Sequence, residues 1–144
     1  MSPRPAVTAD LAHELRLATM RLSRRLRQER ADHGLPLGQL SALATLGRLG
    51  PLTAGALAAH EQVRPPSMTK VLANLVAAGY VDRTPDPLDG RQVVLSLTPR
   101  ARTLLREDRR RREEWLALGL ARLDPDQRAA LAAALPVLEV LADS

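Results

Sequence analysis

Apolar residues recur at helical spacing from the start of the chain. Between residues 8 and 30 they lie three or four positions apart, which predicts a helix that starts at Thr8 or Asp10 and ends near Arg30. Residues 1–7 contain two prolines and are expected to form a loose arm. The apolar stripe consists of Leu11, Leu15, Ala18, Leu22 and Leu26.

Two shorter helices are expected next, after a break at residues 32–38. One covers about Leu37 to Leu49 and ends at a Gly-Pro pair. The other runs from Ala54 to about His60, with Thr53 as its N-terminal cap. The inward residues of the first are predicted to be Leu40, Leu43, Ala44 and Leu46.

The stretch from Arg64 to Gly79, RPPSMTKVLANLVAAG, predicts a fourth helix. Pro65 and Pro66 suit a first turn, where backbone N–H groups have no helical acceptor, and Gly79 suits a C-terminal cap. At about 100° per residue the apolar positions fall on one side of this helix. They are Met68, Val71, Leu72, Leu75 and Val76.

The period then changes from helical to alternating. Tyr80–Thr84 and Gln92–Leu97 read as two strands, and the turn-rich sequence between them predicts a hairpin with a long loop. In the second strand one side is expected to carry Val93, Leu95 and Leu97.

Two more helices are predicted after the hairpin. A Thr-Pro pair at residues 98–99 begins one that can run to about Leu118, where Gly119 is expected to end it. A capping box at residues 124–127 begins the last helix, which Pro136 should kink or split. One face of the last helix is lined by Leu131, Leu135 and Leu138. Long leucine-striped helices at both ends of a chain often pack against another chain. The predicted elements together give a mainly α class with one small β-hairpin.

Composition and charge narrow the function. The net charge is +5 with a pI of about 11.1, which favours an anionic partner. Aromatic residues make up only 1% of the chain, whereas proteins that bind single-stranded nucleic acid stack bases on aromatic rings. Duplex DNA is therefore the favoured partner.

Several other classes are disfavoured. The absence of cysteine excludes disulfides, thiolate catalysis and cysteine-based zinc sites. No secretory signal or apolar run of membrane-spanning length is present, so we expect a soluble cytoplasmic protein with no membrane partner. No phosphate-binding loop or nucleophile motif occurs, so we expect no enzyme and no cofactor. His13, His33 and His60 are widely spaced and are interpreted as surface or packing residues rather than metal ligands.

The outward side of the fourth helix is slim. Ala73 and Ala77 at its centre would let a helix approach the floor of a major groove about 12 Å wide. Asn74 can form the paired hydrogen bonds that an adenine edge offers, and polar side chains around it can reach phosphates or base edges. These are Ser67, Thr69 and Lys70. The alternative is a plain surface helix with small residues chosen for helix propensity.

The predicted hairpin carries Arg83 on one strand and Asp89-Gly90-Arg91 at the start of the other. The Asp89 carboxylate can orient Arg91 for insertion into a narrow minor groove. The alternative is that Asp89 only shapes the turn and Arg91 is solvated.

From Val63 to Ala101 the sequence resembles the MarR family of bacterial transcriptional regulators. The family pattern is a recognition helix, a Leu-x-x-x-Gly segment followed by two hydrophobic residues and an arginine, an Asp-x-Arg wing, and a Leu-Thr start of a long helix. The matching pieces here are Leu75 to Gly79, Tyr80-Val81, Arg83, Asp89 to Arg91, and Leu97-Thr98.

The resemblance implies a winged-helix homodimer, joined by its first and last helices, that binds pseudo-palindromic duplex DNA. The implied division is residues 1–34 and 101–144 for dimerisation and residues 35–100 for the winged helix-turn-helix core. Such regulators mostly repress, and many release DNA when a small ligand binds. The candidate DNA-contacting residues are Arg64, Pro66, Ser67, Thr69, Lys70, Ala73, Asn74, Arg83, Asp89 and Arg91.

The chain departs from the family pattern at Pro65-Pro66, which is stiffer than the usual polar residues, and in having no cysteine for a thiol switch. A ligand site would lie between the dimer helices and the core, with Arg16, Met20, Leu46 and Trp115 as candidate lining residues. The rival interpretation is a helical dimeric adaptor that binds an acidic protein and has no preference among DNA sequences.

Overall fold

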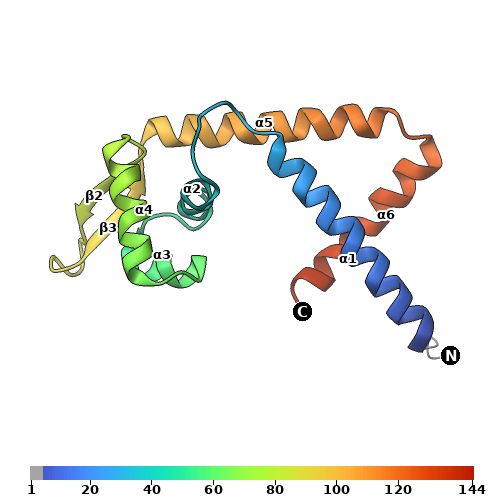
Figure 1. The fold of residues 1–144 in the computed structure, drawn as a ribbon, viewed down its shortest axis with the longest axis horizontal. Helices are drawn as coiled ribbons and strands as arrows, with labels where there is room; N and C mark the ends of the chain where they lie inside the picture. Colours follow the sequence, from blue (N-terminus) through green and yellow to red (C-terminus); the bar gives the residue numbers. More distant parts are fainter. Residues whose placement is uncertain (1–4) are drawn as a thin grey trace. The chain divides into compact units, whose positions relative to one another are not determined.

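The computed structural model describes residues 5–144, which are mainly helical with one small sheet, as predicted (Figure 1). The order of elements agrees with the sequence-based one except for one additional short strand, β1. The elements are α1 (Pro5–Gln28), α2 (Leu37–Leu49), β1 (Leu52–Thr53), α3 (Ala54–Glu61), α4 (Pro65–Ala77), β2 (Val81–Pro85), β3 (Val93–Leu97), α5 (Pro99–Ala121) and α6 (Pro125–Ala142).

The described chain divides into two compact units. The core unit is Ala31–Arg109, and the flanking-helix unit contains α1, α5 from Arg110 onward, and α6. The helix α5 therefore contributes residues to both units.

The core unit buries one hydrophobic cluster among α2, α3, α4, the start of α5 and the sheet. Leu43 of α2, Leu57 of α3 and Leu75 of α4 are completely buried, together with Leu95 of the sheet. The helix α3 packs against both α2 and α4, and α4 also packs against β2. These contacts hold α4 and the hairpin together on one scaffold.

The sheet has the strand order β1-β3-β2 and is antiparallel throughout. Val81 pairs with Leu97 at the inner end of the hairpin, and Pro85 pairs with Val93 at its outer end. Of the three residues expected on one side of the second strand, Leu95 and Leu97 are buried, whereas Val93 is 50% exposed because it lies at the outer end of the hairpin, beyond the core. The strand β1 was missed because two residues are too few to show an alternating pattern.

Helix α2 has the predicted bounds but a different inward face. Leu40, Leu43 and Leu46 are buried, whereas Ala44 is exposed. The buried positions beside the leucines are instead Ala42 and Thr45. Leucine spacing alone does not locate the edges of a buried face, which depend on where α3 and the sheet contact α2.

The end of α4 agrees with the sequence. Gly79 has a positive φ of +78°, a conformation that glycine adopts without strain. Its N–H donates to the Val76 carbonyl at 3.0 Å, and the Tyr80 N–H donates to the Leu75 carbonyl at 2.9 Å. This pair of bonds is the Schellman arrangement, which satisfies carbonyls at a helix C-terminus.

Helix α1 begins at Pro5 rather than at Thr8 or Asp10. Proline is tolerated in a first helical turn, where its missing N–H would have no helical partner. The predicted arm is therefore helical from residue 5, and its residues 1–4 lie outside the described part of the chain.

Helices α5 and α6 each continue past an expected interruption. Gly119 lies inside α5, since a helical glycine costs only about 1 kcal/mol relative to alanine. The capping box at Asp124 and Gln127 is present, with bonds of 2.8 and 3.1 Å. Pro136 does not split α6, which is one helix from Pro125 to Ala142.

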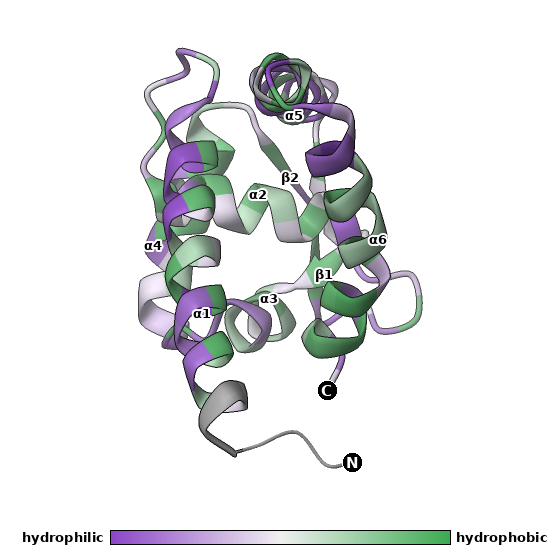
Figure 2. Cartoon of the chain, turned by 90° about the vertical axis from the view of Figure 1, so that its right-hand side faces the viewer, coloured by the Kyte–Doolittle hydropathy of each residue, from purple (hydrophilic) through white to green (hydrophobic). Residues whose placement is uncertain are grey.

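The helix α6 contains no buried residue. Figure 2 shows apolar residues along most of its length, and its large exposed side chains include Leu131, Leu135, Leu138 and Leu141. None of the helices in the described chain combines the length and the apolar character that a bilayer crossing requires.

Candidate nucleic-acid interface

Helix α4 has one buried and one exposed side, as its sequence predicts. Met68, Leu72 and Leu75 are buried in the core, and Val71 and Val76 are partly buried. The candidate DNA-contacting residues of this helix and its cap are all exposed. They are Arg64, Pro66, Ser67, Thr69, Lys70, Ala73 and Asn74.

The first turn of α4 is built by the two prolines. Arg64 is the N-cap residue with an extended backbone, and its carbonyl accepts the Met68 N–H at 3.1 Å. The Thr69 hydroxyl donates to the Pro65 carbonyl at 3.0 Å. Thr69 therefore offers an outside partner its lone pairs rather than its proton, which narrows its role to accepting a hydrogen bond.

The turn before α4 is tight and strained. Gln62 has a left-handed φ of 54°, uncommon for a residue with a side chain, and its N–H donates to the Ala59 carbonyl at 3.2 Å. Next to this turn the Glu61 carboxylate accepts hydrogen bonds from the Ser41 hydroxyl at 2.6 Å and from the Thr45 hydroxyl. Glu61 thus ties the end of α3 to α2, a contact that sequence spacing did not reveal.

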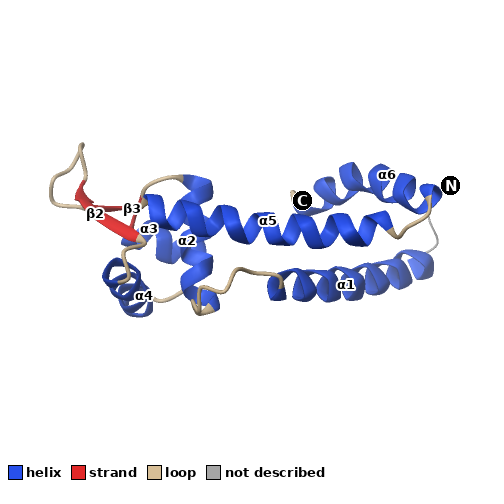
Figure 3. Cartoon of the chain, turned by 90° about the horizontal axis from the view of Figure 1, so that it is seen from above, coloured by secondary structure: helices blue, strands red, loops and turns tan. Residues whose placement is uncertain are grey.

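Figure 3 shows the loop that joins β2 to β3. Its aspartates hold it through local hydrogen bonds. The Asp86 N–H donates to the Gln92 carbonyl at 2.9 Å, and the Asp86 carboxylate accepts the Leu88 N–H at 2.9 Å. Leu88 is 98% exposed at this tip. The Gln92 N–H in turn donates to the Asp89 carbonyl at 3.0 Å. The loop is therefore ordered by local hydrogen bonds rather than by burial.

Asp89 supports Arg91 in a way that differs from the expected one. Its carboxylate accepts the backbone N–H of Arg91 at 3.1 Å, so it sets the course of the chain at Arg91. The Asp89, Arg91 and Arg83 side chains are all exposed. Arg83 lies on β2, opposite Leu95 of β3.

The histidines do not gather. His13 and His60 are exposed, whereas the His33 side chain is only 6% exposed. The His33 Nδ1 accepts the Leu35 N–H at 3.1 Å, so the ring proton is on Nε2, which lies 3.2 Å from the Asp108 carboxylate. That carboxylate also accepts the Ala31 N–H at 2.6 Å. Within residues 5–144 no group of three or more potential ligand side chains is placed to hold a metal ion.

The four candidate ligand-lining residues are divided between the two units. Leu46 is buried in the core unit, whereas Arg16, Met20 and Trp115 belong to the flanking-helix unit. The Arg16 guanidinium lies 3.3 Å from the Met20 sulfur. The Arg25 guanidinium carbon lies 5.1 Å from the centroid of the partly buried Trp115 ring, a cation–π contact that joins α1 to α5.

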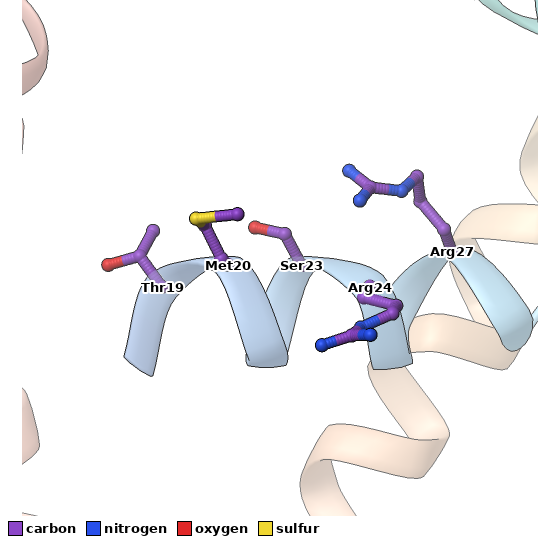
Figure 4. Close-up of a pocket in the computed structure, with 5 residues that line it drawn as sticks. All are labelled: Thr19, Met20, Ser23, Arg24 and Arg27. Atoms are coloured by element: carbon purple, nitrogen blue, oxygen red, sulfur yellow. The ribbon is translucent and has the colours of Figure 1, made fainter. Parts of the chain in front are cut away.

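An open cavity of about 480 Å³ lies along α1. Figure 4 shows its α1 lining, which combines two hydroxyls, a thioether and two guanidinium groups. The residues are Thr19, Met20, Ser23, Arg24 and Arg27. Of the four residues expected to line a ligand site, Met20 is among them.

The chain is similar in sequence to known transcriptional regulators. The MarR family model matches residues 33–92. An HTH-type transcriptional regulator of Mycobacterium tuberculosis is 49% identical over 135 residues, with 94% of each chain covered. One from Mycobacterium leprae is 48% identical over 137 residues, with 94% of this chain and 96% of the other covered.

Solved structures have the same fold. A putative transcriptional regulator from Pseudomonas aeruginosa has a TM-score of 0.84 at 36% identity and covers 95% of this chain and 97% of its own. A MarR family protein from Bacillus stearothermophilus has a TM-score of 0.82 at 21% identity, covering 99% and 100%. The chain therefore belongs to the MarR family of helix-turn-helix transcriptional regulators, which are not enzymes.

Proposed function

We propose that this regulator binds pseudo-palindromic duplex DNA as a homodimer and represses transcription beside its site. The main support is the two-sided character of α4. Its inner side is locked into the core, so its outer side, with short side chains around Asn74, is presented as a rigid and slender surface. Such a surface fits the major groove, where base edges are distinguishable.

Each candidate residue has a distinct role in this proposal. Asn74 reads a base edge, Ala73 permits close approach, and Pro66 shapes the first turn. Ser67, Lys70, Arg64 and Arg83 contact phosphates or base edges, and Thr69 accepts a hydrogen bond from a donor on a base edge. Arg91 enters the minor groove, and Asp89 fixes the backbone that carries it.

Two observations support a dimer. The segment from Glu61 to Arg102 contains six basic and four acidic residues, and this excess of positive charge is too small for one copy to bind DNA tightly. The flanking helices also expose many apolar side chains, as α6 does along most of its length. Burial of these faces between two copies would place two α4 helices on one two-fold site. Dimerisation is accordingly assigned to residues 1–34 and 101–144, and DNA reading to residues 35–100.

A small effector is the remaining part of the proposal. The cavity on α1 offers Arg24 and Arg27 beside the Met20 thioether and two hydroxyls (Figure 4). This lining suits a small organic anion with an apolar part. Release of bound DNA on titration with such anions would support this role, and unchanged binding across a panel of them would count against it.

The test is selection from a random duplex pool by the purified full chain. We expect an enriched pseudo-palindrome whose half-sites are about one helical turn apart, roughly 10 base pairs. Transcription from a promoter that carries the selected site should fall when the protein is added. The variant Asn74→Ala should enrich a site with weaker discrimination at one position of each half-site.

An unenriched pool would contradict the proposal. Equal binding to all duplexes together with tight binding to an acidic protein would favour the adaptor interpretation instead. An enriched site whose occupancy raises transcription would retain DNA reading but remove the repressor role.

A further inference from the structure

The first turn of α5 contacts the chain segment that follows α4. Arg100 Nη1 donates to the Ala78 carbonyl at 2.7 Å, and the guanidinium carbon lies 4.6 Å from the centroid of the Tyr80 ring. The Thr98 hydroxyl donates to the Gly79 carbonyl at 2.7 Å, and the Thr98 N–H donates to the Tyr80 carbonyl at 3.1 Å. We call these five residues the α4–α5 clasp.

The clasp completes the C-terminal end of α4. The helix's own cap uses the Leu75 and Val76 carbonyls, whereas Ala78 and Gly79 present theirs to Arg100 and Thr98. Carbonyls at a helix C-terminus carry partial negative charge, so a guanidinium is favourable there and its hydrogen bond is charge-assisted. The Tyr80 ring, 7% exposed, gives the same guanidinium a face to stack on.

The clasp lies between the two parts of the candidate interface. Asn74 is one helical turn before Ala78, whose N–H donates to the Asn74 carbonyl at 3.0 Å. Tyr80 immediately precedes β2, which leads to the wing. A contact that holds Ala78 and Tyr80 therefore fixes the end of the helix and the start of the wing at once.

We propose that Arg100 is a positioning residue for DNA recognition, acting through the end of α4 rather than on DNA. The inference rests on the proposed function. The competing role for Arg100 is a direct phosphate contact. The guanidinium would then have to leave both the Ala78 carbonyl and the Tyr80 ring, which it contacts in the structure. The two roles differ in how binding depends on sequence and on salt.

The test compares Arg100→Ala with Arg102→Ala, which removes another exposed arginine from the same helix. Affinities for the selected duplex and for an unrelated duplex are measured at several salt concentrations. For Arg100→Ala we expect about a tenfold loss on the selected duplex, comparable to one good base contact. The affinity for the unrelated duplex and the slope of log affinity against log salt should stay as in the parent.

A lost phosphate contact has a different signature. It weakens both duplexes equally and reduces the salt slope by about 1. That result for Arg100→Ala, or unchanged binding to the selected duplex, would overturn the inference. If the parent protein itself prefers no duplex, the proposed function has failed and the inference fails with it. That outcome is distinguishable, because it is seen in the parent before any variant is compared.

Two further variants separate positioning from a general loss of folding. Arg100→Lys keeps a cation that can donate to the Ala78 carbonyl and should recover part of the specific affinity. Thr98→Val removes both bonds of this hydroxyl, the one to the Gly79 carbonyl and the one from the Ala101 N–H at the start of α5, and should reproduce the loss of discrimination. Both comparisons are made at a temperature where circular dichroism shows each variant folded. Loss of binding to both duplexes by Thr98→Val, with full folding, would contradict a shared positioning role.

Discussion

Arg91 stands on a short loop whose geometry is determined by neighbouring polar groups. The Asp89 carboxylate accepts the backbone N–H of Arg91, and the Asp86 carboxylate accepts the backbone N–H of Leu88. An arginine on an ordered loop loses less conformational entropy when it enters a DNA groove than an arginine on a flexible loop loses. The ordered backbone at Arg91 is therefore compatible with the minor-groove role that we propose for this residue.

At the residue scale we predict that Arg91→Ala weakens binding to the selected duplex by about tenfold. The loss should be greatest where the flank is A/T-rich, because a narrow minor groove has the strongest negative potential. Gel-shift titration on duplexes with A/T-rich and G/C-rich flanks measures it. Asp89→Asn is the matched control, since it removes a charge but keeps a side-chain oxygen for the Arg91 N–H. Equal binding by Arg91→Ala and the parent would remove the wing from the mechanism.

Helix α4 has a buried side and an exposed side, to which we assign stability and DNA recognition respectively. Leu72 is buried in the core, and its sequence neighbour Ala73 is exposed on the outward side. Glu61 and Gln62 at one end and the α4–α5 clasp at the other hold this helix in place. Neighbouring substitutions on α4 should therefore affect different properties of the protein.

At the element scale we predict opposite outcomes for Leu72→Ala and Ala73→Glu. The first leaves a cavity and should lower the free energy of unfolding by about 2–4 kcal/mol. The second should change stability by less than about 0.5 kcal/mol, because the position is exposed, but should abolish binding by placing a carboxylate against DNA phosphates. Urea unfolding at fixed protein concentration and titration of the selected duplex provide the two measurements. Full DNA binding by Ala73→Glu would place the interface elsewhere.

None of the described side chains in the flanking-helix unit is buried. Large apolar side chains of α1, α5 and α6 are exposed. Contiguous exposed apolar surface of this kind marks an interaction site. We propose a second copy of the chain as the partner for this surface, because two copies would also double the few basic residues that one core unit presents to DNA.

At the scale of the whole molecule we predict that Leu135→Glu converts a dimer into monomers. Leu135 is 57% exposed, and burial of its carboxylate replacement between two copies would be costly. Sedimentation should report the change, and the slope of log affinity against log salt should fall to about half the parent value as phosphate contacts are halved. Leu37→Glu, at a position equally exposed on the core unit, should remain dimeric. A flat salt plot for the parent, or a dimeric Leu135→Glu, would contradict this arrangement.

The local pattern of the sequence was sufficient for most elements. Prolines at residues 65–66 and Gly79 bounded α4, the capping box at Asp124 began α6, and the spacing of apolar residues located part of the core. These features depend on neighbours within one or two turns, which the sequence displays directly. The exposed candidate residues of α4 followed from the same periodicity.

Only the tertiary structure decided the contacts between distant segments. Three contacts join positions that no periodicity relates: the pairing of β1 with β3, the bonds from Ser41 and Thr45 to Glu61, and the stacking of Arg100 on Tyr80. The exposure of Ala44 likewise depends on which segments pack against α2. Hydrophobic burial is not directional and specifies which residues go inside, whereas a hydrogen bond or a cation–π contact needs two particular groups brought together. The sequence by itself therefore determined the elements and the family, and packing determined how α4 is held in place.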